Sequence, residues 1–399
     1  MREGTRVFRL WDGEPDAAVE RRDGMVVVSR HALVRQVLND PATFAADNAL
    51  DAASPIPVEA MRILARRGFR LPATLANNST ASHPALRAIV AEALAPARVE
   101  ALRGWLTGLV RRRLIPVERR LRAGEDVDLY PVLAADIPLL VLSRLVELPR
   151  DDTALVKRFS RAALELFFAR SSPSRQRELA ELVGEYHARL RRFVRSAGGM
   201  VARVRAECRA DGLGEDGVVA ALFFLLVAGQ ETTSQFLTLL LREMLARPEL
   251  ARGIVRGGHG VDAVVEEGLR LCPPIVSWRR VATMDTTLDG REVRAGDSVL
   301  LWLQAAGTEA CGESFVPGQR GSRRHLAFGA GAHRCLGAHL ARMEAAVVAA
   351  EAAPALRGCR VTREPRCPDN LSFRMPDALV VARTVPRPPG CNAKRTSRG

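Results

Sequence analysis

The sequence predicts a single domain that is mainly α-helical and carries small β-sheets. From about residue 85 to 205, apolar residues recur every three or four positions with arginines between them, which is typical of amphipathic helices. A long apolar helix is expected from about 215 to 245, with Pro248 marking its end. Strand signals return late in the chain, in an Asp-Gly hairpin over 287–293 and a buried strand over 298–303.

Shorter elements complete the predicted order. In chain order they are strands over 6–10 and 25–28, a helix over 261–271, a glycine- and arginine-rich loop over 307–332, a helix from about 336, and strands over 378–384. No linker interrupts this order, so the sequence predicts one domain over residues 1–385. Residues 386–399 are rich in proline, glycine and basic side chains, and we expect a disordered basic tail there.

Composition narrows the class of protein. The formal net charge is +14, but the arginines are dispersed and only two tyrosines are present, which argues against nucleic-acid binding. An acidic protein partner or an anionic group inside the fold explains the charge better. The N-terminus lacks a signal peptide, no apolar span reaches 20 residues, and the seven cysteines form no C-x-x-C pair. We therefore expect a cytoplasmic, reduced protein without a membrane anchor.

The most informative segment is FGAGAHRCLG, residues 328–337. Its first two glycines permit a tight turn and the close approach of a flat ligand to the backbone. Cys335 stands just before the predicted last helix, whose positive end favours a thiolate. Arg334 replaces the third glycine of a dinucleotide-binding fingerprint, which excludes that motif. The alternative is a glycine-rich loop with a buried structural cysteine.

As a whole, this segment resembles the haem-binding loop of the cytochrome P450 family. The resemblance extends over nearly the whole chain, from about residue 6 to 381. It implies the triangular-prism fold of that family, with haem b between the long central helix and the helix after the cysteine loop. It also implies Cys335 as the axial iron ligand, with Phe328, Gly329 and Gly337 against the cofactor.

A second match is the Glu-x-x-Arg tetrad formed by Glu267 and Arg270, which share one helix face. In the family this pair is joined by an arginine from the segment before the haem loop. Here that segment is shorter than usual and lacks the family's Asn-Arg-Asp-Pro sequence. Arg320 is the matching residue, and the shortening leaves its partnership with the pair open. The alternative for such a tetrad is a surface ion pair.

A third match lies midway along the long helix, over residues 228–233 (AGQETT). It resembles the family's oxygen-activation segment, with Gly229 at a local distortion of the helix, Thr232 hydrogen-bonded to oxygen and Glu231 relaying protons. Glycine inside a helix costs about 1 kcal/mol relative to alanine and so asks for a reason. The alternative is an incidental glycine before a wet polar face, which the apolar run over 222–227 disfavours.

A fourth match concerns the haem propionates. His83 and Arg87 have the i, i+4 spacing of the family's propionate-binding pair, and Arg280 and His333 match two further propionate ligands. Cationic and hydrogen-bonding groups are suitable partners for two carboxylates. By themselves, a histidine and an arginine at this spacing more often belong to a solvated helix face.

The resemblance implies a monooxygenase that uses O2 and electrons from NAD(P)H, delivered by a ferredoxin reductase and a ferredoxin. The arginines of the loop, Arg323, Arg324 and Arg334, suit an acidic ferredoxin. We expect a monomer that hydroxylates or epoxidises a largely apolar intermediate of secondary metabolism. Two alternatives stay open, namely haem-thiolate coupling or peroxygenase chemistry, and a non-catalytic family member that acts as a partner protein.

The family's substrate-pocket segments can also be located. They yield six candidates, each of which could instead be an ordinary core residue: Asn77, Phe167, Phe168, Val276, Trp278 and Phe373.

Overall fold

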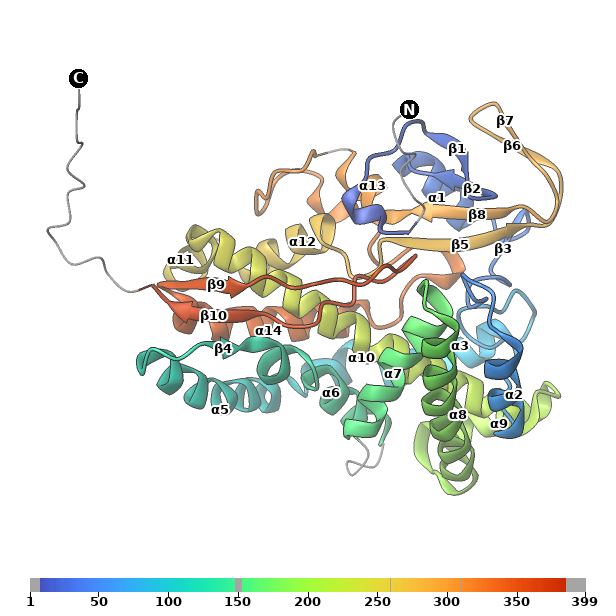
Figure 1. Cartoon of the computed structure of the whole chain (residues 1–399), viewed down its shortest axis with the longest axis horizontal. Helices are drawn as coiled ribbons and strands as arrows, with labels where there is room; N and C mark the ends of the chain where they lie inside the picture. Colours follow the sequence, from blue (N-terminus) through green and yellow to red (C-terminus); the bar gives the residue numbers. More distant parts are fainter. Residues whose placement is uncertain (1–7, 148–152, 259, 310, 385–399) are drawn as a thin grey trace, which may run out of the picture.

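The computed structural model describes residues 8–384 apart from 148–152, 259 and 310 (Figure 1). The α-helices are α1 (His31–Asn39), α2 (Val58–Arg66), α3 (His83–Ala93), α4 (Pro96–Glu100), α5 (Arg103–Arg122), α6 (Ile137–Val146), α7 (Thr153–Phe168), α8 (Pro173–Ser196), α9 (Gly199–Ala210), α10 (Gly214–Ala246), α11 (Pro248–Arg256), α12 (Val261–Leu271), α13 (Leu303–Thr308) and α14 (Ala338–Leu356). Shorter helical turns are η1 (Leu10–Asp12), η2 (Tyr130–Ala134), η4 (Ser322–Arg324) and η5 (Gly331–His333).

The strands form three small sheets. They are β1 (Val19–Arg22), β2 (Met25–Val28), β3 (Phe44–Ala45), β4 (Val127–Asp128), β5 (Ser277–Ala282), β6 (Thr286–Leu288), β7 (Arg291–Val293), β8 (Ser298–Trp302), β9 (Cys359–Arg363) and β10 (Val380–Arg383). The largest sheet has the order β1-β2-β8-β5-β3, the second has the order β4-β10-β9, and β6 with β7 forms a hairpin. Only the β2–β8 pair in these sheets is parallel, with Val26 opposite Val299. The mainly helical class with small sheets is therefore confirmed.

Helix α10 is the centre of the core. It runs through the middle of the molecule and packs against α6, α7, α8, α9 and α14 (Figure 1). Of the helices in the described part of the chain, it is the one long and apolar enough to cross a membrane. Because 78% of its most apolar window is buried inside the protein, it is a core helix here.

Most of the predicted elements are confirmed, with small shifts at their ends. The long helix, the helix over 261–271, the strand over 25–28 and the Asp-Gly hairpin occur where expected. Pro248 ends α10 as predicted and then occupies the first turn of α11, where its missing N–H costs nothing. The last helix begins at Ala338 rather than 336, because Gly337 is its N-cap.

The predicted strand over 6–10 is wrong in its described part. Arg9 has φ 60°, a left-handed conformation that ends any extended segment, and Leu10 begins the turn η1. Residues 6 and 7 lie outside the described residues, as does the predicted tail over 386–399. Phe8 and Leu10 are nevertheless buried, because they pack in a small core cluster beside the large sheet.

A buried ion pair ties α12 to the segment before the cysteine loop. Arg270 donates to Glu267 through Nη2 (2.7 Å) and Nε (3.0 Å), and both side chains are fully buried. Arg270 also donates to the carbonyl of Ser314 (2.9 Å). Glu267 Oε1 in turn accepts from the backbone N–H of Val316 (3.0 Å) and from Gln319 Nε2 (2.5 Å). The pair is thus satisfied on all sides.

The expected third partner, Arg320, is not part of this network. Its side chain is exposed, and the neighbouring Gln319 supplies the inward-facing donor instead. Gly318 (φ 81°) and Gly321 (φ 99°) turn the shortened segment sharply on both sides of these two residues. The turn directs the 319 side chain, and not the 320 side chain, toward α12.

Arg270→Ala should therefore lower the free energy of unfolding by about 3–5 kcal/mol, because it leaves the Glu267 carboxylate buried without its partner. Arg320→Ala is the matched control and should change it by no more than about 0.5 kcal/mol, as for most surface positions. Urea unfolding of both variants measures the difference. Comparable losses in the two would show that Arg320 has a buried role after all.

Candidate functional site

The cysteine loop is held tightly against α1. The backbone N–H of Cys335 donates to the carbonyl of Phe328 (2.9 Å), and that of Gly329 donates to Leu326 (2.8 Å). Gly329 (φ 64°) and Gly331 (φ 67°) both adopt a left-handed conformation, which explains the two glycines. A Cβ added at Gly331 would lie 2.2 Å from the carbonyl oxygen of Leu38, so only glycine fits against α1 there.

The Cys335 thiol faces a cavity of about 260 Å³. Desolvation raises the pKa of the thiol, while the backbone N–H of Gly337 and the positive charges of Arg87, Arg342 and Arg334 act in the opposite direction. We expected the positive N-terminal end of the last helix to stabilise a thiolate at Cys335. In the structure this stabilisation comes from the backbone N–H of Gly337, the N-cap residue of α14. Cys335 combines access to a cavity with nearby donors, which is the setting of a thiolate ligand.

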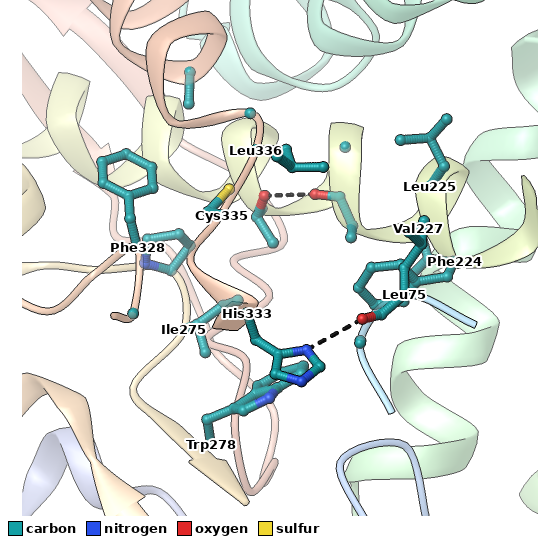
Figure 2. Close-up of a pocket in the computed structure, with 18 of the residues that line it drawn as sticks. Leu75, Phe224, Leu225, Val227, Ile275, Trp278, Phe328, His333, Cys335 and Leu336 are labelled. Atoms are coloured by element: carbon teal, nitrogen blue, oxygen red, sulfur yellow. Dashed lines mark hydrogen bonds between the residues drawn. The ribbon is translucent and has the colours of Figure 1, made fainter. Parts of the chain in front are cut away.

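One wall of the cavity is cationic. Arg87, Arg280, His333 and Arg334 line it, and the rings of His83 and His333 stack with centroids 4.2 Å apart. His333 Nδ1 lies 3.2 Å from the carbonyl oxygen of Leu75. Figure 2 marks this contact with a dashed line. Desolvation, together with His83 and Arg280, lowers the pKa of His333 to about 4. The structure brings together all four residues matched to propionate ligands.

This wall holds positive charge without a balancing anion. Arg280 is buried, its Nη1 donates to the neighbouring carbonyl of Arg279 (2.8 Å), and burial lowers its pKa to about 10. His83 Nε2 is buried and has no hydrogen-bond partner among the described residues. Within residues 8–384, with the gaps given above, no carboxylate lines the cavity. Such a wall fits the acidic edge of a ligand.

The opposite side of the cavity is formed by α10. Figure 2 shows Phe224, Leu225 and Val227 of this helix facing the same space as Cys335 and Phe328. Thr232 lines the cavity one turn further on, and its hydroxyl donates to the carbonyl of Ala228 (2.8 Å). A hydroxyl is thus available on α10 in the cavity that the thiol lines.

One expectation for α10 needs correction. The helix is continuous over Gly214–Ala246, so the local distortion expected at Gly229 is absent from it. Gly229 instead allows close packing, because an added Cβ would lie 3.0 Å from Cδ2 of Leu142 on α6. Glu231, the neighbour of Thr232 in the chain, does not line the cavity, and its side chain is completely buried.

Glu231 lies close to two cations of α7. Its Oε1 lies 2.7 Å from Lys157 Nζ, and its Oε2 lies 3.8 Å from Arg161 Nη1. Desolvation lowers the pKa of Lys157, while Glu231 opposes that shift. We did not predict either cation from the sequence. The available signal was that Lys157 is one of only two lysines in an arginine-rich chain.

Four of the six substrate-pocket candidates line the cavity: Phe167, Phe168, Trp278 and Phe373. Phe168 lies against Phe373 with ring centroids 4.9 Å apart, and Trp278 stacks on Phe168 at 6.2 Å. These rings form an aromatic wall built from α7, β5 and the segment before β10.

The other two candidates do not reach the cavity. Val276 is fully buried in the cluster with Leu300 and Trp302, because residues along an extended segment alternate in direction and its neighbour Ile275 faces the cavity instead. The Asn77 Oδ1 accepts from the backbone N–H of Thr74 (3.3 Å), so this side chain closes a local turn. Both assignments are corrected accordingly.

A second buried network supports the loop from behind. Glu266 on α12 accepts from Arg342 Nε (2.5 Å) and lies 3.1 Å from His325 Nε2. Burial opposes ionisation of Glu266, but the bonds to His325 and Arg342 outweigh it and lower its pKa to about 2. Arg342 also lies over the ring of Phe328, 4.4 Å from its centroid. The network therefore fixes the first residue of the loop.

Comparison with known proteins agrees with this geometry. The sequence profile of the family described as Cytochrome P450 matches residues 260–361. A 20-oxo-5-O-mycaminosyltylactone 23-monooxygenase of Streptomyces fradiae is 30% identical over 87% of this chain and 79% of its own length. Cytochrome P450-SU2 of Streptomyces griseolus is 31% identical over 84% and 79%.

Solved structures show the same architecture. A complex of cytochrome P450 CREJ with (4-ethylphenyl) dihydrogen phosphate has a TM-score of 0.85 at 27% identity and covers 94% of this chain and 95% of that chain. The CYP116B5 heme domain of Acinetobacter radioresistens has a TM-score of 0.84 at 26% identity, with 92% of each chain covered.

Replacing either glycine of the loop by alanine should destabilise the protein, but by different amounts. Gly329→Ala should cost about 1–2 kcal/mol, the penalty of a left-handed conformation for a residue with a Cβ, because nothing lies within 4 Å of that Cβ. Gly331→Ala should cost at least about 1–3 kcal/mol more, since the α1 backbone must also move. Urea unfolding of the two variants measures this, and equal losses would contradict the packing argument.

Proposed function

Because this chain belongs to the cytochrome P450 family and is a monooxygenase, we propose that it inserts one oxygen atom of O2 into a largely apolar small molecule. The balanced reaction for a hydroxylation is R–H + O2 + NAD(P)H + H⁺ → R–OH + H2O + NAD(P)⁺. The observation that carries the proposal is the accessible Cys335 thiol in the cavity that the Thr232 hydroxyl also lines. We propose haem b as the cofactor of this site.

The residues present fit such a cofactor. Cys335 would bind the haem iron, supported by the Gly337 N–H, and Phe328, Gly329 and Gly337 would lie against the macrocycle. His83, Arg87, Arg280 and His333 would bind its propionates, which would supply the anions that their wall lacks. The bound haem-thiolate iron supplies the reduction of O2 and the transfer of oxygen to carbon.

The protein must deliver protons to the cavity and exclude bulk water from it. The Thr232 hydroxyl is the donor that we place at the cavity wall, and Glu231 behind it is the group that would relay protons from outside. Glu231 and Thr232 are neighbours on α10, so the helix fixes the relative position of their backbones. This acid–alcohol pair favours O2-driven insertion over peroxide-driven chemistry as the physiological reaction.

The substrate class follows from the walls of the cavity. Its charged lining residues, Arg87, Arg280 and Arg334, all belong to the wall that we assign to the cofactor. Aromatic and aliphatic side chains of α7, α10 and β5 form the remaining surface. An uncharged, largely apolar molecule suits these walls. The mycaminosyltylactone monooxygenase and the erythromycin C-12 hydroxylase among the relatives make an intermediate of secondary metabolism the natural candidate. Hydroxylation and epoxidation both remain within this proposal.

For electrons, we propose NAD(P)H, a ferredoxin reductase and an acidic ferredoxin. Arg323, Arg324 and Arg334 are exposed on the cysteine loop and its preceding segment, and the chain carries a net charge of +14. Opposite charge on the partner would steer it toward the thiolate side of the cofactor. We further propose a cytoplasmic monomer.

Cys335→Ala should abolish the far-red Soret band of the reduced protein with CO that is characteristic of thiolate ligation, together with oxidation of substrate. Cys311→Ala, at a half-buried thiol outside the cavity, is the matched control and should keep both. Visible spectra of the purified variants decide the matter. A normal band in Cys335→Ala would refute the assignment of the ligand.

Arg323→Glu combined with Arg324→Glu should slow reduction by an acidic ferredoxin at low salt, with an unchanged haem spectrum. Charge steering is screened over about 8 Å at physiological ionic strength, so the difference should shrink as salt rises. Arg177→Glu combined with Arg192→Glu, at two exposed positions on α8, is the control that changes the net charge by the same amount. If stopped-flow reduction of the double variant equals that of the control at every salt concentration, the ferredoxin docks elsewhere.

A further inference from the structure

We propose that the substrate of this protein carries an uncharged aromatic ring, which the cavity recognises through contacts with its own aromatic side chains. This inference rests on the proposed function, because it concerns the molecule that the monooxygenase site oxidises. It goes further in naming the chemical group that binds, since a largely apolar molecule could equally be an aliphatic chain or a saturated ring system.

Aromatic side chains are concentrated at the cavity. The chain of 399 residues has only 13 phenylalanines, 4 tryptophans and 2 tyrosines. Eight of these aromatic residues line the cavity, and neither tyrosine is among them. Leucine, valine and alanine dominate the rest of the core, so the rings mark this cavity and not the protein interior in general. Six of them come from α7, α10, β5 and the segment before β10: Phe167, Phe168, Phe223, Phe224, Trp278 and Phe373.

Three of these rings recognise one another. Trp278 lies nearly parallel to Phe168, with ring centroids 6.2 Å apart and an angle of 24° between the ring planes. Phe373 stands edge-on to both, at 72° to Phe168 and 82° to Trp278. Stacked and edge-to-face arrangements are the ones that the charge distribution of aromatic rings favours. A further ring beside this group would therefore meet faces and edges that suit it.

A second group of rings joins α7 to α10. Phe69 is nearly parallel to Phe167, at 6.2 Å and 21°, and edge-on to Phe223, at 5.8 Å and 73°. Phe159 also packs edge-on against Phe223, with centroids 4.7 Å apart. Phe69 and Phe159 do not line the cavity themselves, so they support Phe167 and Phe223 from behind.

The first group is also fixed before any substrate binds. The guanidinium carbon of Arg279 lies 5.6 Å from the ring centroid of Phe168. The backbone N–H of Phe373 donates to Asn370 Oδ1 (2.8 Å), and Phe373 itself is buried. A wall that is already ordered loses little conformational freedom on binding, so its ring contacts contribute fully to affinity.

The charges around the cavity favour a neutral ring. Its charged lining residues, Arg87, Arg280 and Arg334, all belong to the wall that we assign to the cofactor. No carboxylate of the described residues lines the cavity, so a cationic amine would be buried without a partner. An anionic group would likewise find no cation among the aromatic and aliphatic side chains of the substrate side. An uncharged ring meets neither cost.

A matched pair of probes separates ring recognition from general apolar burial. 2-Naphthalenemethanol and its fully hydrogenated counterpart have the same carbon skeleton and the same alcohol group. The saturated compound is the more hydrophobic of the two, so a merely apolar wall would bind it as well or better. We expect the aromatic compound to bind the haem-loaded protein at least about threefold more tightly, because aromatic pairs gain beyond their buried area. Spectral titration and isothermal calorimetry measure the two Kd values, and a smaller ratio would overturn the proposal.

Phe168→Leu and Trp278→Leu each remove a ring but keep an apolar side chain, and each should lower this ratio about twofold or more. Phe193→Leu, at a partly buried ring of α8 outside the cavity, is the matched control and should leave the ratio unchanged. If Phe168→Leu and Trp278→Leu both keep the ratio of the unmodified protein, the rings are ordinary core residues and the proposal is overturned.

All titrations use protein that shows the far-red CO band, so a variant that fails to fold or to bind haem is recognised before its affinity is measured. Absence of this band from the unmodified protein would contradict the proposed function. An intact band without a preference for the aromatic probe would contradict the present inference alone.

Discussion

The structure depends above all on an unbalanced concentration of positive charge beside Cys335. Arg280 is buried, Arg87 lines the same cavity, and the rings of His83 and His333 stack, with His83 Nε2 unpaired among the described residues. Burying cations without anions is costly, so this arrangement is stable only if other parts of the fold hold it or a ligand neutralises it. A cofactor that brings two carboxylates answers this need, and its binding should therefore contribute to the stability of the fold.

The rest of the fold supports that wall from two sides. On one side, the Glu267–Arg270 pair connects α12 with the segment before the loop and leaves none of its polar atoms unpaired. On the other, Glu266 and Arg342 hold Phe328. Unlike the cations beside Cys335, these buried charges are paired and locally neutral, so their role is structural. The paired charges on α12 support the site, whereas the unpaired charges beside Cys335 belong to the site itself.

Glu231 occupies an intermediate position between these two kinds of charge. Its first oxygen is paired with Lys157, but its second has no donor, although a guanidinium lies 3.8 Å away. It is therefore less completely paired than Glu267, whose two oxygens both accept hydrogen bonds from Arg270.

The sequence by itself determined the helical class, α10 and α12, the hairpin and the ten-residue loop around Cys335. Each of these depends on local physics: periodicity, turn residues and glycines that adopt positive φ. The resemblance also located His83, Arg87, Arg280 and His333, which the structure brings together. The strand over 6–10 could not be foreseen as wrong, because the burial of Phe8 and Leu10 against distant residues, and not their β-propensity, sets the local backbone.

Only the tertiary structure decided which of two adjacent side chains faces the buried partner or the cavity. Gln319 rather than Arg320 faces Glu267, because two glycine turns set the direction of the chain. Ile275 rather than Val276 reaches the cavity, because extended residues alternate between two faces. Lys157 and Arg161 meet Glu231 only through the packing of α7 against α10. The sequence shows which side chains are available, but the packed fold sets the direction in which each one points. Adjacent residues of the chain point into different environments, so the fold decides which of the two reaches the site.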